Sequence, residues 1–407
     1  MRVLSRSAPL VVLILSLSTV TAPAAPAGPP LTPWRTTEIK PGDVMVHGLA
    51  FDDAGGGVGA GRAYIRENGR VVDSVPAVLS RDRDTGMWRQ STVKTPGAGV
   101  SLRDVDLASP DSALAVGTFD PVAGGFPTAV SRKDSWDAVT APAPPGIRSG
   151  LLADVDVVSA TDAWAVGTVD YAEEGPGGSP PQQPIVEHWN GEAWTRTPLP
   201  EPKVEGWSGF GAVAAVAPDD VWVAGHAYEG QAPPLAHFDG GTWQYVPLPF
   251  EGNSLWAGVT SLLARSPQDI WALGFMQDPT AGEERPLLWH FDGRKWTQAA
   301  APVEDMRVIK AVATPTGIAA LTMHRSEGYE VYTITGDRWT RLALPKAPKG
   351  EAQWPTAIAY DNGRLTVAAA GLAESPDGSA PIRALLFSTR VQPVAAPSSP
   401  LASPVGA

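Results

Sequence analysis

The chain has 407 residues, no cysteine and a formal net charge of -12. Nucleic acids and anionic membrane surfaces bind clustered basic residues, so the acidic balance argues against both as partners. Without cysteine, disulfides are excluded, and so is a lipid attached through a cysteine near the amino terminus.

The first 27 residues predict a secretory signal. Arg2 and Arg6 precede the apolar run Pro9–Leu17, and the small-residue stretch TAPAAPAG follows. A basic start, a short apolar stretch and an A-x-A-like site are typical of a cleaved signal, here after Ala24 or Ala27. Because the apolar run is too short to span a bilayer, we expect a secreted, extracellular protein.

A tryptophan-containing phrase recurs through the body of the chain, over residues 33–390. Examples are EHWNGEAWTRTPLP, AHFDGGTWQYVPLP and WHFDGRKWTQAAAP. A period of about 50 residues is typical of propellers and similar arrays. The tryptophans of this phrase are Trp88, Trp136, Trp194, Trp243, Trp296 and Trp339.

Each repeated unit predicts four short strands, as the third unit illustrates. LADVDVVS (152–159), DAWAVG (162–167), PIVEHW (184–189) and AWTRTPL (193–199) are separated by turns that include SATD and Asn190-Gly191. Asn-Gly pairs suit tight hairpin turns because these turns need positive φ angles. Four strands in a repeated unit favour propeller blades over a sandwich.

The units predict an all-β, seven-bladed β-propeller with four antiparallel strands per blade. The last unit has strands near 356–361, 364–370 and 382–390 but no fourth strand. Pro33–Thr37 copies the WTRTPLP phrase, so we expect this N-terminal strand to complete the last blade and close the ring, which leaves no exposed sheet edge. The Pro/Ser/Ala-rich tail, 391–407, is predicted to be disordered. The units begin near Val46, Ser101, Leu151, Gly209, Ala257, Met306 and Trp354.

The hairpins HFDGGTWQYVPLP and TITGDRWTRLALP resemble the last hairpin of kelch and galactose-oxidase-like propeller repeats. They also resemble the Trp-rich repeats of secreted actinobacterial propellers, mostly of unassigned function. The resemblance covers about residues 33–390 and implies a propeller fold. The copper-radical chemistry of galactose oxidase is not implied, because its site needs a cysteine that this chain lacks.

Three histidines recur at one position of the repeat, six residues before the tryptophan of the fourth strand. Three histidines form a common zinc set, but equivalent positions in successive blades are a whole blade apart and do not converge on one ion. We therefore expect packing or hydrogen-bonding roles for these histidines, and an inter-blade core role for the tryptophans of strands two and four. The histidines are His188, His237 and His290, and the strand-two tryptophans are Trp164, Trp222 and Trp271.

Long acidic, Gly/Pro-rich loops and three loop tryptophans form the predicted ligand-binding face. The loops include TVDYAEEGPGGSPPQQP (168–184) with Asp170 and Tyr171, and HAYEGQAPP (226–234) with Tyr228. Loops on a rigid scaffold often carry binding residues, although they also serve as solvated surface. Trp207, Trp256 and Trp354 precede the first strands of three blades. They either ring the channel mouth, where flat rings suit sugars or apolar peptides, or fill gaps between blades.

Carboxylates in the first strands of two neighbouring units are the candidate catalytic groups. In RDVD and ADVD, period two places Asp104 with Asp106, and Asp154 with Asp156, on common faces. These side chains could act as an acid/base pair or hold Ca²⁺, or they could bind backbone amides and channel water. No other metal or cofactor is expected.

His47, in MVHGLAFDD, is a further catalytic candidate, because it is the one histidine predicted to face the channel, with Asp52 and Asp53 in the same blade. No G-x-S-x-G, H-E-x-x-H or phosphate loop accompanies it. The sequence therefore favours a monomeric extracellular binding protein for a glycan or a protein surface. A carbohydrate-active lyase or hydrolase that uses the channel carboxylates is the alternative, and a structural cell-wall component is the third.

Overall fold

The computed structural model describes residues 33–391, except 41, 53, 95–98, 110–111, 133–134, 172–181, 201–206, 251–253, 279, 281, 302, 326, 337 and 374–379. The predicted signal and the predicted tail from residue 392 onward lie outside the described residues, as does Asp53. The chain divides into the units Met1–Pro30 and Leu31–Ala407, and everything described below belongs to the second. Among the described residues, no helix has the length and hydropathy that crossing a membrane requires.

The described secondary structure consists of strands in a repeating order of four. The first strands are β2 (Val44–Phe51), β6 (Leu102–Ser109), β10 (Ile147–Ser159), β14 (Trp207–Ala217), β18 (Trp256–Ser266), β22 (Met306–Thr314) and β26 (Glu351–Asp361). The second strands are β3 (Gly57–Glu67), β7 (Ser112–Gly117), β11 (Asp162–Tyr171), β15 (Asp220–Tyr228), β19 (Asp269–Gln277), β23 (Gly317–His324) and β27 (Arg364–Ala373).

The third and fourth strands complete each unit. The third strands are β4 (Arg70–Arg81), β8 (Gly125–Arg132), β12 (Gln182–Trp189), β16 (Leu235–Phe238), β20 (Glu284–Phe291), β24 (Gly328–Thr335) and β28 (Ile382–Arg390). The fourth strands are β5 (Trp88–Thr92), β9 (Ser135–Pro142), β13 (Trp194–Arg196), β17 (Trp243–Tyr245), β21 (Trp296–Gln298), β25 (Arg338–Ala343) and, from the other end of the chain, β1 (Arg35–Ile39).

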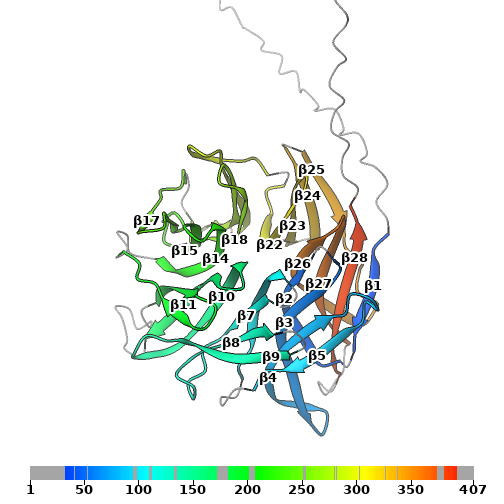
Figure 1. The fold of residues 1–407 in the computed structure, drawn as a ribbon. Coiled ribbons are helices and arrows are strands. Elements are labelled where there is room, and N and C mark those ends of the chain that lie inside the picture. The colour runs from blue at the N-terminus through cyan, green and yellow to red at the C-terminus, as the bar shows by residue number, and fades with distance from the viewer. Residues whose placement is uncertain are drawn as a thin grey trace, which may run out of the picture. The chain divides into compact units, whose positions relative to one another are not determined.

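Strand pairing gives a propeller of five four-stranded sheets and one eight-stranded sheet (Figure 1). The sequence predicts seven separate sheets, and the difference arises between β15 and β18. These strands pair through His226 with Gly258, Ala227 with Ala257, and Tyr228 with Trp256. This short ladder joins the unit β14–β17 to the unit β18–β21 in one sheet.

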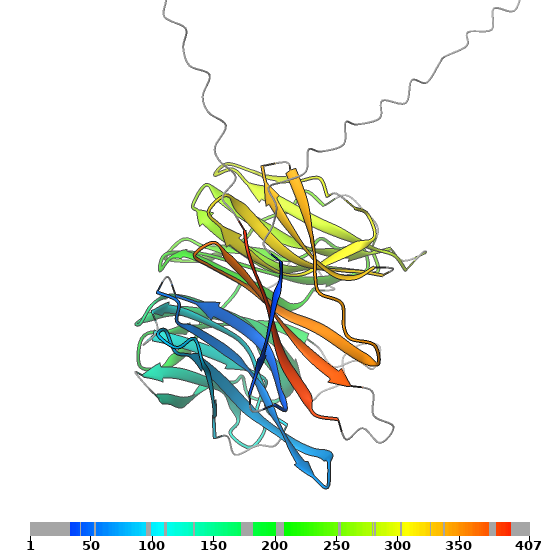
Figure 2. The same cartoon turned by 90° about the vertical axis from the view of Figure 1, so that its right-hand side faces the viewer.

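The N-terminal strand completes the last sheet, as predicted from Pro33–Thr37. β1 pairs antiparallel with β28, with Arg35 opposite Ser388 and Ile39 opposite Ala384. Figure 2 shows the blue β1 running beside the red β28. β26 of the same sheet contacts β2, so chain segments about 300 residues apart in sequence are neighbours.

The apolar core lies between successive units, and tryptophans form part of it, as the repeat predicts. Trp194 packs with residues of β7, β8, β10, β11 and β12, so its cluster joins two units. Trp243 and Trp164 occupy the next cluster, and Trp296 and Trp222 the one after that. Each sheet therefore buries both faces against its neighbours, which explains why strands such as DAWAVG are apolar on both sides.

Candidate functional site

An axial cavity of about 300 Å³ lies where the first strands meet. Residues of β2, β6, β10, β14, β18, β22 and β26 line it, and these strands are called the inner strands below. Its polar lining includes Asp104, Asp106, Asp154 and Asp156, so the structure brings together all four carboxylates that the sequence singles out. Lys310, on β22, is the basic side chain among them.

Three of the four carboxylates accept hydrogen bonds from the backbone of the next inner strand. Asp106 Oδ2 accepts from the Val157 amide, Asp154 Oδ2 from the Val213 amide, and Asp156 Oδ2 from the Ala215 amide, each at 2.8 Å. Neighbouring inner strands do not form sheet ladders here, so these side chains satisfy amides that the sheets leave unpaired. The carboxylates thus connect successive units.

Lys310 neutralises the cluster from the other side of the cavity. Its ammonium donates to Asp154 Oδ1 and lies 3.4 Å from Asp104 Oδ2. Burial opposes the lysine charge, but the two carboxylates raise the pKa of Lys310 above its usual value. The ammonium lies between these two carboxylates, where the sequence suggested that Ca²⁺ could bind. Among the described residues, no group of three or more His, Asp or Glu side chains could hold a metal ion.

The four carboxylates differ in their proton affinity. Burial raises the pKa of Asp104 well above its usual range, and the adjacent Asp154 carboxylate contributes. Burial acts on Asp154 in the same direction, but Lys310 and hydrogen bonds from its neighbours outweigh it and lower the pKa. Burial raises the pKa of Asp106 to about 6, and burial together with Asp106 raises that of Asp156 to about 8. At neutral pH the cavity therefore holds both ionised and protonated carboxyls.

His47 lies at a β-bulge near the start of β2, away from the cavity lining, so its predicted place facing the channel is wrong. The bulge falls between Val46 and Gly48, and a bulge re-aims the side chain of the extra residue. The cavity is lined on β2 by Leu49, Ala50 and Phe51 instead. Burial, with additional repulsion from Arg103 and Arg62, lowers the pKa of His47 to about 3. Asp52, of the same blade, is paired with Arg83.

An aromatic row, consisting of His226, Trp256 and Tyr228, lies on the paired ends of β15 and β18. The Tyr228 and Trp256 rings are nearly parallel, at 14°, with centroids 6.3 Å apart, and the His226 ring is 5.7 Å from Trp256. Tyr228 is 41% exposed. Trp256 also packs edge-on against Phe275, and its Nε1 has no hydrogen-bond partner.

The other predicted ligand-binding residues lie at separate positions. Trp354 is on β26, two residues before its bulged position, and is 40% exposed. Trp207 begins β14, opposite Ala227, and its side chain lies outside the described residues. Asp170 is held by Ser149 and Gln182, and Tyr171 donates to Gln183, so both belong to a local network at the end of β11. Among the members whose side chains the structure describes, Trp256 and Tyr228 meet across two strands, whereas Asp170 and Tyr171 are neighbours along β11.

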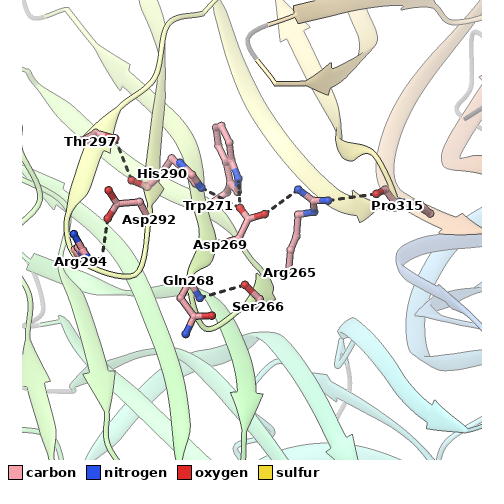
Figure 3. A network of polar contacts seen from close by, with 10 residues as sticks. All are labelled: Arg265, Ser266, Gln268, Asp269, Trp271, His290, Asp292, Arg294, Thr297 and Pro315. Atoms are coloured by element: carbon pink, nitrogen blue, oxygen red, sulfur yellow. Dashed lines mark hydrogen bonds and ion pairs between the residues drawn. The ribbon is translucent and has the colours of Figure 1, made fainter. Parts of the chain in front are cut away.

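The recurring histidines each bond an aspartate of their own unit, and in two of the three units the strand-two tryptophan joins them in an Asp–Trp–His network, as the packing interpretation predicts. In Figure 3, Asp269 Oδ1 accepts from Trp271 Nε1 at 2.9 Å and from His290 Nε2 at 3.0 Å. The Trp271 and His290 rings are stacked, with centroids 4.5 Å apart. His237 with Asp220 and Trp222 repeats this arrangement. Because each histidine is satisfied within its own unit, these residues are structural.

Lys310, Arg62 and Arg103 are the side chains of this region that the sequence reasoning missed. A signal for Lys310 exists, because VIKAVA (308–313) aligns with LRDVDL (102–107) and LADVDV (152–157) about each bulge. This alignment places Lys310 at the position of Asp104 and Asp154. No comparable local signal marks the two arginines.

No protein-family model and no curated protein matches the chain. Solved structures do match. The polysaccharide lyase Uly1 has a TM-score of 0.52 at 10% identity, covering 87% of this chain and 91% of that one. The β-propeller domain of the trilobed protease from Pyrococcus furiosus, which has an open velcro topology, has a TM-score of 0.50 at 10% identity, covering 86% and 94%. A chain of the mitotic checkpoint complex has a TM-score of 0.50 at 9% identity, covering 90% and 98%. At these identities the likeness concerns the fold alone.

Proposed function

We propose that the chain is a secreted, monomeric glycan-binding protein on a seven-bladed, kelch-like propeller. The blade count treats the eight-stranded sheet as two blades joined at the ends of β15 and β18. It is supported by the seven inner strands that line one cavity and by the contact between β26 and β2. Export is supported by the signal-like start of the sequence.

The aromatic row, in which Tyr228 is exposed and Trp256 and His226 are half-buried, carries the proposal. Tyr228 and Trp256 present nearly parallel rings on adjacent strands, and rigid aromatic faces pack against the CH groups of sugars. Trp354 adds a second exposed ring near the start of another inner strand. That a polysaccharide lyase shares the fold is compatible with this role, although the proposal depends on the rings.

A carbohydrate-active enzyme is the second candidate, supported by the cavity carboxyls. Asp156, with its pKa raised to about 8, would hold a proton at neutral pH, while Asp154 would be ionised. A general acid beside a general base is what a hydrolase or lyase needs. Against this role, three of the carboxylates already accept backbone amides.

The experiment incubates the mature protein with a panel of insoluble and arrayed polysaccharides, with calcium and then with chelator, and measures retention and released sugar. We expect retention without release, and at least tenfold weaker retention for Trp256→Ala and Tyr228→Ala, since each loses an aromatic contact of about 1.5 kcal/mol or more. Met87→Ala, which truncates a side chain 66% exposed before β5, is the matched control.

Three other results would contradict the proposal. Released sugar that disappears in Asp156→Asn would favour the enzyme. Retention that the two aromatic variants do not change would remove the aromatic row from the site. A protein partner captured without any glycan retention would replace the glycan as ligand.

A further inference from the structure

Two arginines and a histidine lie close enough to interact electrostatically where β2, β3 and β6 adjoin. β2 and β6 approach so closely at Gly48 that a Cβ there would lie 2.7 Å from the Asp104 Cα. The residues just before these two, His47 and Arg103, are therefore neighbours, and each occupies the bulged position of its strand. Arg62, on β3, pairs with Met45, two residues before His47.

Among the described residues, neither Arg62 nor Arg103 takes part in an ion pair. Other arginines at comparable positions do: Arg307, on the first strand of its unit, pairs with Glu284, and Arg66, on the same strand as Arg62, pairs with Asp43. Arg62 Nε and His47 Nε2 are buried without hydrogen-bond partners. Unsatisfied buried polar groups are costly, so native structures rarely keep them without a ligand or a water.

The three groups are close enough to affect one another electrostatically. Arg103 is an exposed residue, but partial desolvation lowers its pKa, and Arg62 adds to this effect. Both arginines also disfavour the charged form of His47, after burial, which is the larger cause. The Tyr64 ring lies under the Arg62 guanidinium, 4.9 Å away, and orients it. An anion would relieve the repulsion and satisfy the free donors together.

We propose that Arg62, Arg103 and His47 bind an anionic group, carboxylate or sulfate, of an acidic polysaccharide. This inference rests on the proposed glycan-binding function and adds the charge of the ligand to it. Planar guanidinium groups match the two oxygens of a carboxylate or sulfate, and His47 supplies one further donor. The site lies at the bulges near the starts of β2 and β6, and the exposed Trp354 lies at the same level of β26. The protein has a net charge of -12 and therefore repels polyanions in general. Binding of an acidic polysaccharide would need a local basic site.

The test compares dextran, dextran sulfate and oligogalacturonate as ligands for the mature protein at physiological salt. We expect the wild type to bind dextran sulfate or oligogalacturonate more tightly than dextran. The double variant Arg62→Gln/Arg103→Gln should lose tenfold or more of that affinity, because each charged hydrogen bond is worth about 1.5 kcal/mol or more. Arg294→Gln, which removes one exposed charge from the β20–β21 turn, should bind like the wild type.

A second measurement keeps the inference testable if the double variant folds poorly. Titration of the wild type with galacturonate or sulfate should shift the NMR signals of the His47 ring and leave those of His188 unchanged. Equal affinity for dextran and the polyanions, together with an unmoved His47 signal, would overturn the anion site.

The two proposals fail separately. Acidic glycan binding that survives in Arg62→Gln/Arg103→Gln but is lost in Trp256→Ala would overturn the anion site and leave the glycan-binding function intact. A galacturonate-dependent shift of His47, with no polysaccharide retained, would support the anion site and overturn the glycan function.

Discussion

The carboxylate of Asp154, on β10, accepts a 2.8 Å hydrogen bond from the backbone amide of Val213, on β14. These strands belong to different sheets. The amide therefore bonds to a side-chain carboxylate, whereas within a sheet it would bond to a backbone carbonyl. Asp156 repeats the contact two residues further along both strands, with Ala215. The repeated offset shows that the two inner strands run in the same direction.

Replacing Lys310 with methionine should destabilise the fold by about 2–4 kcal/mol, because the change leaves the buried Asp154 charge without its partner. The loss should shrink as pH falls, since Asp154 can then take up a proton. Urea denaturation at pH 5 and pH 8 measures both effects. Adding Asp154→Asn should recover part of the loss, and Lys295→Met, at an exposed turn, should change little. Equal losses at both pH values would show that Lys310 acts through packing alone.

Glu187 should make stability fall as pH rises. It is fully buried, both its carboxylate oxygens lack hydrogen-bond partners, and burial raises its pKa from 4.5 to about 8. Between these values the unfolded chain has lost the proton that the folded chain keeps, so stability decreases through this window by roughly 5 kcal/mol. Glu187→Gln should be more stable than the wild type at pH 8.5 and close to it at pH 4.5, as thermal unfolding would show. A constant difference between the two proteins would contradict this account.

The Asp–Trp–His networks should differ in strength. Asp269→Ala removes the acceptor of Trp271, His290 and Arg265, and should cost about 1–3 kcal/mol. Asp162 accepts from His188 at 3.2 Å, but Trp164 Nε1 has no partner. Asp162→Ala should therefore cost less than Asp269→Ala in the same urea titration, and the opposite order would refute the assignment.

The N-terminal strand should contribute to global stability. Ile39 is 1% exposed and packs in the cluster that joins the last sheet to the first. Ile39→Ala should cost about 2–5 kcal/mol, as expected for a large-to-small change in a core. Thr37→Ala, on the same strand but exposed, is the control. If unfolding were unaffected by Ile39→Ala, β1 would be a loosely attached edge.

The repeat predicted the architecture because its signals are local. Turn pairs such as Asn190-Gly191 and the strand-four tryptophans mark every unit, and even the pairing of β1 with β28 follows from a copied phrase. The ladder between β15 and β18 could not be predicted in this way, because it depends on how closely two units approach. Gly258 permits that approach, since any Cβ there would overlap the His226 ring.

Residues of the candidate sites could be predicted only where the alternation of a strand determines which way a side chain points. The two-residue alternation along a strand predicts that Asp104 and Asp154 face the cavity. Lys310 is 156 residues from Asp154 in sequence, and the two meet because the units are arranged in a ring. His47 was misplaced because a bulge reverses the alternation at that residue. The neighbours that the bulge gives it, Arg62 and Arg103, became visible only in the structure.

The β15–β18 ladder also bears on how the molecule can move. These two units share a ladder of three residue pairs. The joint between the units β6–β9 and β10–β13 instead has a single bridge, Thr118 with Leu151, next to a hydrogen bond from the Phe119 amide to the Gly150 carbonyl. They should open and close as a single body, so that any breathing of the propeller is confined to the other joints. The aromatic row spans the joint that has this ladder, and Tyr228 and Trp256 can therefore keep their mutual spacing while the remainder of the ring fluctuates.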